Sequence, residues 1–324
     1  MPSFVRAAAL AGALPPVGGD WMRRAERIAR SVAATLQEKA KLEDGDWRAM
    51  PCVVGSSSHF IGAREAEPAA KLGPPVEFAA RLARCFGVSG PAMAVNTACT
   101  SGLTGLALAR DLIDAGVWRH ALVLGVELAN RLTLAGFGAL GLLSPTAARP
   151  CDRERDGLSL GEAFGAVVVS GSGAWRIAAV ANEIDPAGFT APAPNEQVIA
   201  GAMRSALSAA GWEEVDLLKL QAGGSPTGDL AEARAVRSVF ARVPSLVSFK
   251  GAIGHTLGAS GPAELALLLD ALAEGRVPPT AGFGKADPEL GIEPKSADAR
   301  SIRRVLFNLA GFGGHVACLA LARE

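Results

Sequence analysis

The sequence predicts an α/β fold built from two halves of similar element order. Short apolar runs, typical of buried strands, alternate with longer segments of helical periodicity along the whole chain of 324 residues. This alternation favours parallel-rich sheets covered by helices. The order of elements in residues 1–172 returns in residues 173–324. We therefore expect a layered sandwich of two duplicated halves, each forming one domain.

The first half is expected to contain five strands and three helices. The apolar run that follows Arg6 is short, has one preceding basic residue and leads into an amphipathic stretch, so we interpret it as a strand rather than a signal peptide. The helix that follows Cys99 is apolar on nearly every face, which predicts a core helix ended by Gly116 in the left-handed conformation. The strands are expected at 4–12, 51–55, 92–95, 120–127 and 163–169, and the other helices at 20–41 and 76–86.

The second half is expected to repeat this order, with a corner from a loop to a buried helix at His255 where the first half has Cys99. Gly275 is expected to end the apolar helix that follows His255. A glycine-rich loop at 308–315 leads into the last strand. The strands are expected at 175–181, 217–220, 245–249 and 315–322, and the helices at 195–210, 230–240 and 257–274.

The composition excludes several classes of function. The 32 Lys and Arg residues balance the 32 Asp and Glu residues, so the net charge gives no reason to expect a nucleic acid or an anionic membrane as a partner. No stretch reaches membrane-spanning length without charges or helix breakers. The five cysteines are dispersed, with no CxxC pair and no metal-ligand spacing. This pattern indicates a reducing, cytoplasmic location and argues against a disulfide framework or a metal site.

Cys99 stands at a predicted corner between a short buried strand and the apolar helix. The partial positive charge at the start of a helix favours the thiolate, which is the nucleophilic form of cysteine. Ala98, Thr100, Ser101 and Gly102 are small and leave room for an acyl group. Two interpretations stay open at this point, namely a nucleophile that carries an acyl group and a buried structural thiol.

Several further stretches follow in order around this corner. They include a loop after a buried strand, a link between a strand and a helix, and the glycine-rich loop near the C-terminus. From about residue 84 to the C-terminus, their order and spacing resemble the motifs of the elongating β-ketoacyl-ACP synthases of the thiolase superfamily. The stretches are 97–102, 137–145, 151–162, 221–229, 249–264 and 308–315.

The resemblance implies a thiolase-like fold of two fused βαβαβ halves and a protein that is usually dimeric. It also implies that the protein acts on acyl thioesters carried by the phosphopantetheine of an acyl carrier protein and needs no cofactor of its own. Cys99 matches the nucleophile that accepts the acyl chain, and His255 matches the second active-site histidine. Lys250 and Glu264 match the charged pair that supports this histidine. Phe312 matches the gating phenylalanine. The flexible loop around it contains the glycines Gly311, Gly313 and Gly314.

The sequence departs from the family at the other active-site histidine, because Gln221 occupies its place. Glutamine cannot accept and return a proton, but its amide can donate a hydrogen bond to an enolate, so Gln221 stays among the expected catalytic residues. Gly223 and Ser225 stand at the two threonine positions of the same motif. This change reduces the number of contacts expected with a phosphopantetheine arm, and Ser225 stays as an expected substrate contact.

Three functions follow as hypotheses. In the first, Cys99 takes an acyl group and condenses it with a malonyl unit, as in fatty acid, polyketide or polyene biosynthesis. In the second, the chain is a non-condensing partner that resembles chain-length-factor subunits. In the third, it transfers acyl groups through Cys99 without decarboxylation. The expected partners are an acyl carrier protein and either a second copy of this chain or another ketosynthase-like chain.

Overall fold

The computed structural model describes residues 2–13, 20–69, 71–186, 195–295 and 297–324. Within these residues, ten strands form one mixed sheet in the order β3-β2-β4-β5-β1-β6-β10-β9-β7-β8. The elements up to the middle of the chain are β1 (Ser3–Ala13), α1 (Trp21–Ala40), α2 (Asp44–Ala49), β2 (Cys52–Gly55), α3 (Ile61–Ala66), α4 (Pro75–Cys85), β3 (Ala92–Val95), α5 (Ser101–Asp114), β4 (Ala121–Glu127), α6 (Arg131–Ala139) and β5 (Gly161–Ser170).

The second set of elements repeats the first in outline. Its members are β6 (Trp175–Ile184), α7 (Glu196–Ala210), β7 (Leu217–Lys219), α8 (Pro226–Val239), β8 (Ser245–Val247), α9 (Lys250–Ile253), η1 (Leu257–Ala259), α10 (Ser260–Ala273), η2 (Ala299–Ser301), β9 (Arg304–Ala310), η3 (Phe312–Gly314) and β10 (His315–Arg323). The strand order β3-β2-β4-β5-β1 has its counterpart in β8-β7-β9-β10-β6. The duplication expected from the sequence is therefore present in the sheet. The boundary between residues 172 and 173 falls in the turn between β5 and β6, and the division into domains there stays a prediction.

Strand direction differs from the parallel-rich sheet that we expected. The pairs β2–β3, β2–β4, β7–β8 and β7–β9 are parallel, whereas the strands in the middle of the sheet pair antiparallel. The short connection 311–314 between β9 and β10 can join only antiparallel strands, because a parallel pair needs a long crossover. The two halves of the sheet meet where β1 pairs with β6 at Ser3–Ile177 and Phe4–Arg176.

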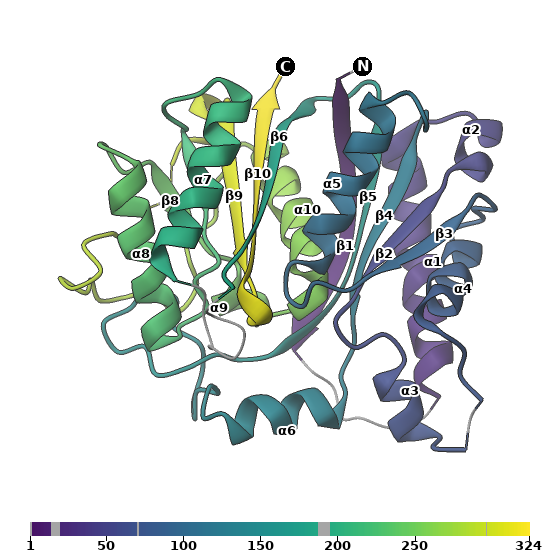
Figure 1. The fold of residues 1–324 in the computed structure, drawn as a ribbon, viewed down its shortest axis with the longest axis horizontal. Helices are drawn as coiled ribbons and strands as arrows, with labels where there is room; N and C mark the ends of the chain where they lie inside the picture. The colour runs from purple at the N-terminus through teal and green to yellow at the C-terminus, as the bar shows by residue number, and fades with distance from the viewer. Residues whose placement is uncertain (1, 14–19, 70, 187–194, 296) are drawn as a thin grey trace.

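Helices α5 and α10 form the middle layer of the molecule. Figure 1 shows them between the two halves of the sheet, with α1 and α4 on one outer side and α7 and α8 on the other. Glycines allow the middle helices to approach closely. A Cβ added to Gly102 in α5 would lie 2.3 Å from Cδ of Pro262 in α10, and a Cβ on Gly261 would lie 2.7 Å from the backbone N of Leu103. Because the helices begin side by side, the corners that carry Cys99 and His255 lie together.

Most elements lie where the sequence predicts them, but several differ. Helix α8 begins at Pro226 and not at residue 230, because proline suits the first turn of a helix and Ser225 caps it. Strand β3 is half-buried rather than buried, since it lies at the edge of the sheet. The sequence interpretation missed β9, whose end occupies part of the expected loop 308–315. It also missed helices α3 and α6.

Two expectations concern membranes and the first strand. Among the described residues, no helix combines the length and the apolar character that crossing a bilayer requires. The apolar run after Arg6 is part of strand β1, which pairs with β5 along its length, so its interpretation as a strand is confirmed.

Candidate active site

Cys99 and His255 lie in direct contact in the interior of the molecule. The Nε2 atom of His255 is 3.1 Å from Sγ of Cys99, and the two residues are 4% and 3% exposed. Cys99 precedes helix α5 by two residues, and His255 lies between α9 and η1. The structure therefore brings together the two residues that the sequence places at equivalent corners of the two halves.

A strained backbone turn presents Cys99 at this corner. Ala98 has φ +52°, in the left-handed region that residues other than glycine rarely adopt. The turn is held by Ser101, whose Oγ donates to the carbonyl of Ala98 at 2.5 Å and accepts from the N–H of Thr97 at 3.0 Å. Because both ends of the turn bond to one hydroxyl, the sulfur cannot swing away with the loop.

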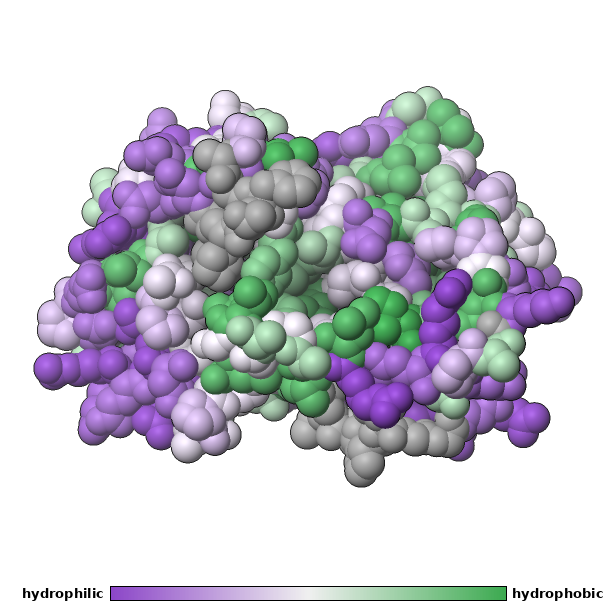
Figure 2. Space-filling view, turned by 60° about the horizontal axis from the view of Figure 1, so that its bottom comes forward, coloured by the Kyte–Doolittle hydropathy of each residue, from purple (hydrophilic) through white to green (hydrophobic). Residues whose placement is uncertain are grey.

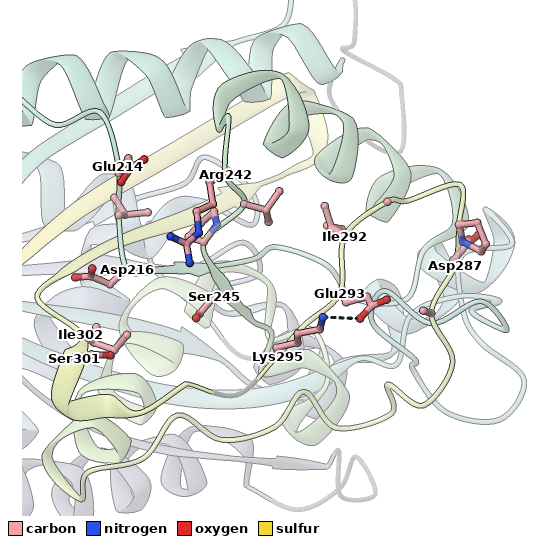
Figure 3. A pocket seen from close by; sticks show the side chains of 16 residues that line it. Glu214, Asp216, Arg242, Ser245, Asp287, Ile292, Glu293, Lys295, Ser301 and Ile302 are labelled. Atoms are coloured by element: carbon pink, nitrogen blue, oxygen red, sulfur yellow. Dashed lines mark ion pairs between the residues drawn. The ribbon is translucent and has the colours of Figure 1, made fainter.

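The Cys99–His255 pair lines a small, largely apolar cavity of about 60 Å³. A larger groove of about 740 Å³ lies beside the edge strand β8, where charged side chains of both signs surround it and Glu293 pairs with Lys295 at 3.1 Å (Figure 3). The described residues that line the larger groove include no cysteine or histidine. We therefore place the candidate site at the smaller cavity, because it holds the nucleophile.

Burial keeps both members of the pair neutral. It raises the pKa of the Cys99 thiol to about 12, although hydrogen bonds from the backbone of Phe312 and the charge of Lys250 act to lower it. Burial also lowers the pKa of His255 to about 3, and the positive charge of Lys250 adds to this effect. The expectation that the helix start favours the thiolate is therefore wrong for the resting protein. Burial destabilises an isolated thiolate more than the partial positive charge of the helix end stabilises it.

The glycine-rich loop packs directly on Cys99. A Cβ on Gly311 would lie 3.0 Å from the backbone N of Cys99, and Gly313 has φ +76°, so both positions favour glycine. The backbone of Phe312 hydrogen-bonds the Cys99 thiol, as does the backbone of Cys99 itself. Two N–H groups are thus directed at the place where an oxyanion forms during acyl transfer.

Phe312 packs against an aromatic residue for which the sequence analysis named no role. Its ring lies 5.3 Å from that of Phe137 at 86°, and Phe137 in turn lies 6.5 Å from the ring of His255. Phe137 is the buried residue of α6, while Leu132 and Leu134 on the same helix are exposed. Figure 2 brings the lower side of Figure 1 forward, where α6 lies, and shows apolar side chains gathered near the centre of this face.

Lys250 and Glu264 lie behind His255 rather than in the lining of the cavity. They form a buried ion pair that is completed by Lys219, a residue that the sequence analysis missed. All three side chains are at most 1% exposed. Burial lowers the pKa of Lys219 to about 7, with the neighbouring Lys250 also acting against its charge. The one signal in the sequence was a lysine inside the apolar strand Leu217–Lys219.

The loop that carries Gln221 forms the opposite wall of the cavity. Glu232 accepts the backbone N–H groups of Gln221 and Ala222, and Asp229 accepts those of Gly223 and the following glycine. Oε1 of Gln221 is buried and has no hydrogen-bond donor among the described residues. The wall is therefore rigid in its backbone and presents one amide side chain to the cavity.

Gly223 and Ser225, which the sequence resemblance places at two threonine positions, differ in their fit. A Cβ on Gly223 would lie 2.6 Å from Cδ2 of Leu158, so the pocket has closed over the space of a side chain. Ser225 lines the cavity, but its Oγ accepts the N–H of Gly228 at 3.3 Å as the N-cap of α8. The hydroxyl of Ser225 is thus shared between the helix end and the cavity.

The charged run 151–156 takes part in several ion pairs. Arg155 pairs with Asp287 at 2.5 Å, and Glu154 pairs with Arg149 and Lys285. Asp152 accepts backbone N–H groups from the segment that begins at residue 284. In the described part of the chain, no cluster of three or more His, Cys, Asp or Glu side chains is arranged to hold a metal ion.

Comparison with known proteins agrees with this geometry. Residues 18–172 match the family model "Beta-ketoacyl synthase, N-terminal domain", and residues 176–284 match "Beta-ketoacyl synthase, C-terminal domain". The chain is 33% identical over 260 residues to 3-oxoacyl-[acyl-carrier-protein] synthase 2 of Staphylococcus aureus strain COL, a match that covers 74% of this chain and 63% of that protein. The synthase of the same name from Mycobacterium bovis is 31% identical over 249 residues, covering 70% and 60%. The chain thus spans less than two thirds of these relatives.

Solved structures share the fold over nearly the whole chain. "The ishigamide ketosynthase/chain length factor" is 26% identical with a TM-score of 0.80, covering 93% of this chain and 82% of that one. A β-ketoacyl synthase from Burkholderia phymatum is 23% identical with a TM-score of 0.82, covering 95% and 83%. From the family models, the sequence identity and the shared architecture, we conclude that this chain belongs to the β-ketoacyl synthase family and has the thiolase fold.

Proposed function

We propose that the chain forms an acyl thioester on Cys99 and condenses the acyl group with a malonyl unit carried by an acyl carrier protein. The observation that carries this proposal is the 3.1 Å contact between Sγ of Cys99 and Nε2 of His255 at a small, largely apolar cavity. The curated relatives are named 3-oxoacyl-[acyl-carrier-protein] synthases, which agrees with this substrate class.

Acyl transfer needs a base for the thiol proton and donors for the oxyanion. In the proposed step, His255 accepts the proton as Sγ of Cys99 attacks the thioester carbonyl. The N–H groups of Cys99 and Phe312 stabilise the tetrahedral intermediate, which collapses when the carrier thiolate leaves. This thiolate takes the proton from His255. The low pKa of the imidazole favours the return of the proton, so the histidine ends the step neutral.

Condensation replaces the carrier by a malonyl thioester. Loss of CO2 leaves an enolate, whose carbon attacks the carbonyl of acyl-Cys99. A carbon–carbon bond forms, the bond to Sγ breaks, and the Cys99 thiolate takes up a proton from solvent to restore the thiol. In this proposal two donors bond to the enolate oxygen, namely the amide of Gln221 and His255 in the tautomer that carries its proton on Nε2, because both residues line the cavity. Gln221 supplies a donor but no proton transfer.

The small cavity limits the acyl group that this state of the protein can hold. At about 60 Å³, with Phe312 packed against Phe137, it has no space for a long chain. A longer acyl group requires Phe312 to turn away from Phe137. The glycines on both sides of Phe312 give the loop the backbone freedom for this movement.

A second candidate function is acyl transfer without decarboxylation, or support of a competent synthase as a non-condensing partner. Two features favour it, namely Gln221, at the position that the sequence resemblance assigns to an active-site histidine, and the space closed over Gly223 by Leu158. Solved relatives of the same fold include a ketosynthase in complex with its chain length factor from Xenorhabdus doucetiae, at 23% identity and a TM-score of 0.78. Because Cys99 is in contact with His255, we favour the condensing function.

The partners belong to the same proposal. An acyl carrier protein delivers both substrates, and a second chain, either another copy or a ketosynthase-like protein, completes a dimer. A structure of similar fold is described as an acyl carrier protein in complex with its ketosynthase. Leu132 and Leu134 of α6 and Leu140 directly after it are exposed, while Phe137 of the same helix lines the cavity, and exposed apolar side chains that gather in a patch are typical of protein contacts.

Mass spectrometry of the intact protein tests the proposal. With acyl-loaded carrier protein, the natural chain is expected to gain the mass of one acyl group, and Cys99→Ala is expected to gain none. Addition of malonyl-loaded carrier is then expected to release CO2 and a 3-oxoacyl product. A natural chain that never gains the acyl mass would refute the proposal. Acyl transfer without CO2, restored to condensation by Gln221→His, would establish the second candidate instead.

A further inference from the structure

Glu127 is a buried carboxylate at the end of β4 to which the proposed mechanism assigns no role. It is 2% exposed, and its partners in the described part of the chain are hydrogen-bond donors, none of them a cation. Oε2 accepts the N–H of Ser57 at 2.9 Å, the Oγ of Ser57 at 2.6 Å and the N–H of Gly258 at 3.1 Å, while Oε1 accepts the hydroxyl of Ser58. Four donors thus offset the desolvation of one carboxylate.

One of these donors belongs to the turn that follows His255. Gly258 lies in η1, three residues after the histidine, and a Cβ on it would lie 2.6 Å from the backbone N of Ser57. The backbone of His255 bonds to Ser159 and Gly161 on its other side, at 2.7 and 3.1 Å. Its ring has a weaker anchor, since Nδ1 is 3.5 Å from Oγ of Ser260. The position of the ring therefore depends on the backbone between residues 255 and 258.

The other donors connect Glu127 to the turn that carries Cys99. The carbonyl of Ser57 accepts the side-chain N–H of Asn96 at 3.3 Å, and Oδ1 of Asn96 accepts the N–H of Ala98 at 3.1 Å. Ala98 is the strained residue directly before Cys99. A continuous chain of hydrogen bonds therefore runs from the turn after His255 through Glu127, Ser57 and Asn96 to the nucleophile.

We propose that Glu127 is a positioning residue, which holds the turn of His255 and the turn of Cys99 at the spacing that brings imidazole and thiol into contact. The assignment rests on the proposed function, in which this contact serves acyl transfer. Glu127 reaches neither cavity nor substrate, and it acts through the two turns that it joins.

The charge of Glu127 gives this role a measurable signature. Besides burial, the negative charge of Glu127 raises the pKa of the Cys99 thiol, whereas Lys250 acts in the opposite direction. His255 faces the sulfur directly, and the carboxylates Asp229 and Glu232 lie on the opposite wall of the cavity. Glu127→Gln removes the charge, which is expected to favour the thiolate, and it keeps only one of the two oxygens that accept hydrogen bonds from the two turns.

The test is the rate at which iodoacetamide alkylates Cys99, followed by mass spectrometry of the Cys99 peptide between about pH 7 and pH 10. Glu127→Gln is expected to raise the rate about three- to tenfold at a given pH, the effect of a pKa lowered by about half a unit to one unit. In the natural chain, His255→Ala is expected to change the rate of alkylation. In Glu127→Ala, where the two turns no longer keep their spacing, the same substitution is expected to change this rate by a smaller factor. Melting curves check that each variant is folded.

Glu162→Gln is the matched control. Glu162 is also a buried glutamate at the end of a strand, but it bonds to Arg24 and to the backbone of Ala129 rather than to the two turns. This variant is expected to alkylate at the natural rate. Should Glu127→Ala fail to fold, the effect of His255→Ala is measured in Glu127→Gln, where it is likewise expected to differ from that in the natural chain.

Two results would overturn the assignment. One is a folded Glu127→Gln whose alkylation profile superimposes on those of the natural chain and Glu162→Gln. The other is an effect of His255→Ala that has the same factor whether or not Glu127 is present. A natural chain that alkylates at Cys99 but never forms the acyl thioester would refute the proposed function, and the alkylation profiles would still decide the role of Glu127.

Discussion

Replacement of Lys219 by methionine is expected to stabilise the protein at neutral pH. Lys219 and Lys250 share the single carboxylate of Glu264, so the buried triad carries an excess positive charge. Burial lowers the pKa of Lys219 from 10.5 to about 7, and this difference corresponds to about 5 kcal/mol of unfavourable free energy for the protonated side chain below pH 7. Methionine has a similar length and keeps Glu264 paired with Lys250.

Two losses reduce this gain. The ammonium of Lys219 lies 4.0 Å from the centre of the Phe307 ring, a contact worth about 1–2 kcal/mol when buried. Glu264 also loses one of the two cations that lower its pKa. Replacement of a whole buried ion pair or triad by apolar side chains of similar volume is typically neutral or stabilising by about 1–4 kcal/mol, and Lys219→Met leaves no carboxylate unpaired because Lys250 still pairs with Glu264. We expect Lys219→Met to raise the free energy of unfolding within this range at pH 7.

The pH dependence identifies the cause. Because the pKa of Lys219 is lowered in the folded state, the unfolded chain binds more protons between about pH 7 and pH 10.5, and the stability of the natural chain rises with pH in this range. Methionine carries no proton and lacks this rise. The advantage of Lys219→Met is therefore full below pH 7 and disappears as the pH approaches 10.5.

Urea denaturation followed by tryptophan fluorescence, at several values between about pH 6.5 and pH 9.5, measures both quantities. Lys285→Met is the control, because Lys285 pairs with Glu154 at the surface with its side chain 64% exposed. It is expected to change stability by less than about 0.5 kcal/mol. A Lys219→Met variant that is less stable than the natural chain at pH 7, or that keeps the same rise with pH, would refute the reasoning.

Three further substitutions are expected to separate close packing from open space and to test the loop of Gln221. Gly102→Ala places a Cβ 2.3 Å from Pro262 and is expected to lower stability by about 1–3 kcal/mol, whereas Gly201→Ala, inside α7 with nothing within 4 Å, is expected to raise it by about 0.5–1 kcal/mol. Equal melting temperatures for the two would contradict the proposed packing of the middle layer. Asp229→Asn replaces one of the two carboxylate oxygens that accept the N–H groups of Cys151 and Gly223 by an amide NH2, and is expected to cost about 1–3 kcal/mol. Burial raises the pKa of Asp229 to about 6. The stabilisation of the folded state that comes from this raised pKa is therefore complete below about pH 4 and is lost as the pH rises through 6. Melting curves at pH 4.5 and pH 7 are expected to show this loss in the natural chain and not in Asp229→Asn.

The corners that carry Cys99 and His255 could be predicted from local sequence patterns. Cys99 and His255 each stand where a loop runs into an apolar helix rich in small residues, and helix starts of this kind are determined by nearby sequence. The motif order around them was sufficient to predict the family and the duplicated fold. The wall formed by Gln221 and the glycine loop with Gly311 also followed from the motifs, because each lies within one short stretch.

Other features of the site depend on residues that are far apart in the chain. Lys219 looks like an isolated charge in an apolar strand until Glu264, 45 residues later, is placed beside it. Phe137 lies on a helix whose other large residues are exposed, so its periodicity does not predict a place in the cavity. In neither case does the local sequence identify the residue that makes the contact.

Protonation of the nucleophile illustrates the same division. The sequence alone established a cysteine at the start of a core helix, and from the helix end we expected a thiolate. How far the sulfur lies from water was decided by the packing of α5, the 311–314 loop and His255, which meet only in the folded molecule. Because removal from water outweighs a helix end in setting the pKa of a thiol, the identity of the nucleophile was a local property and its charge a tertiary one.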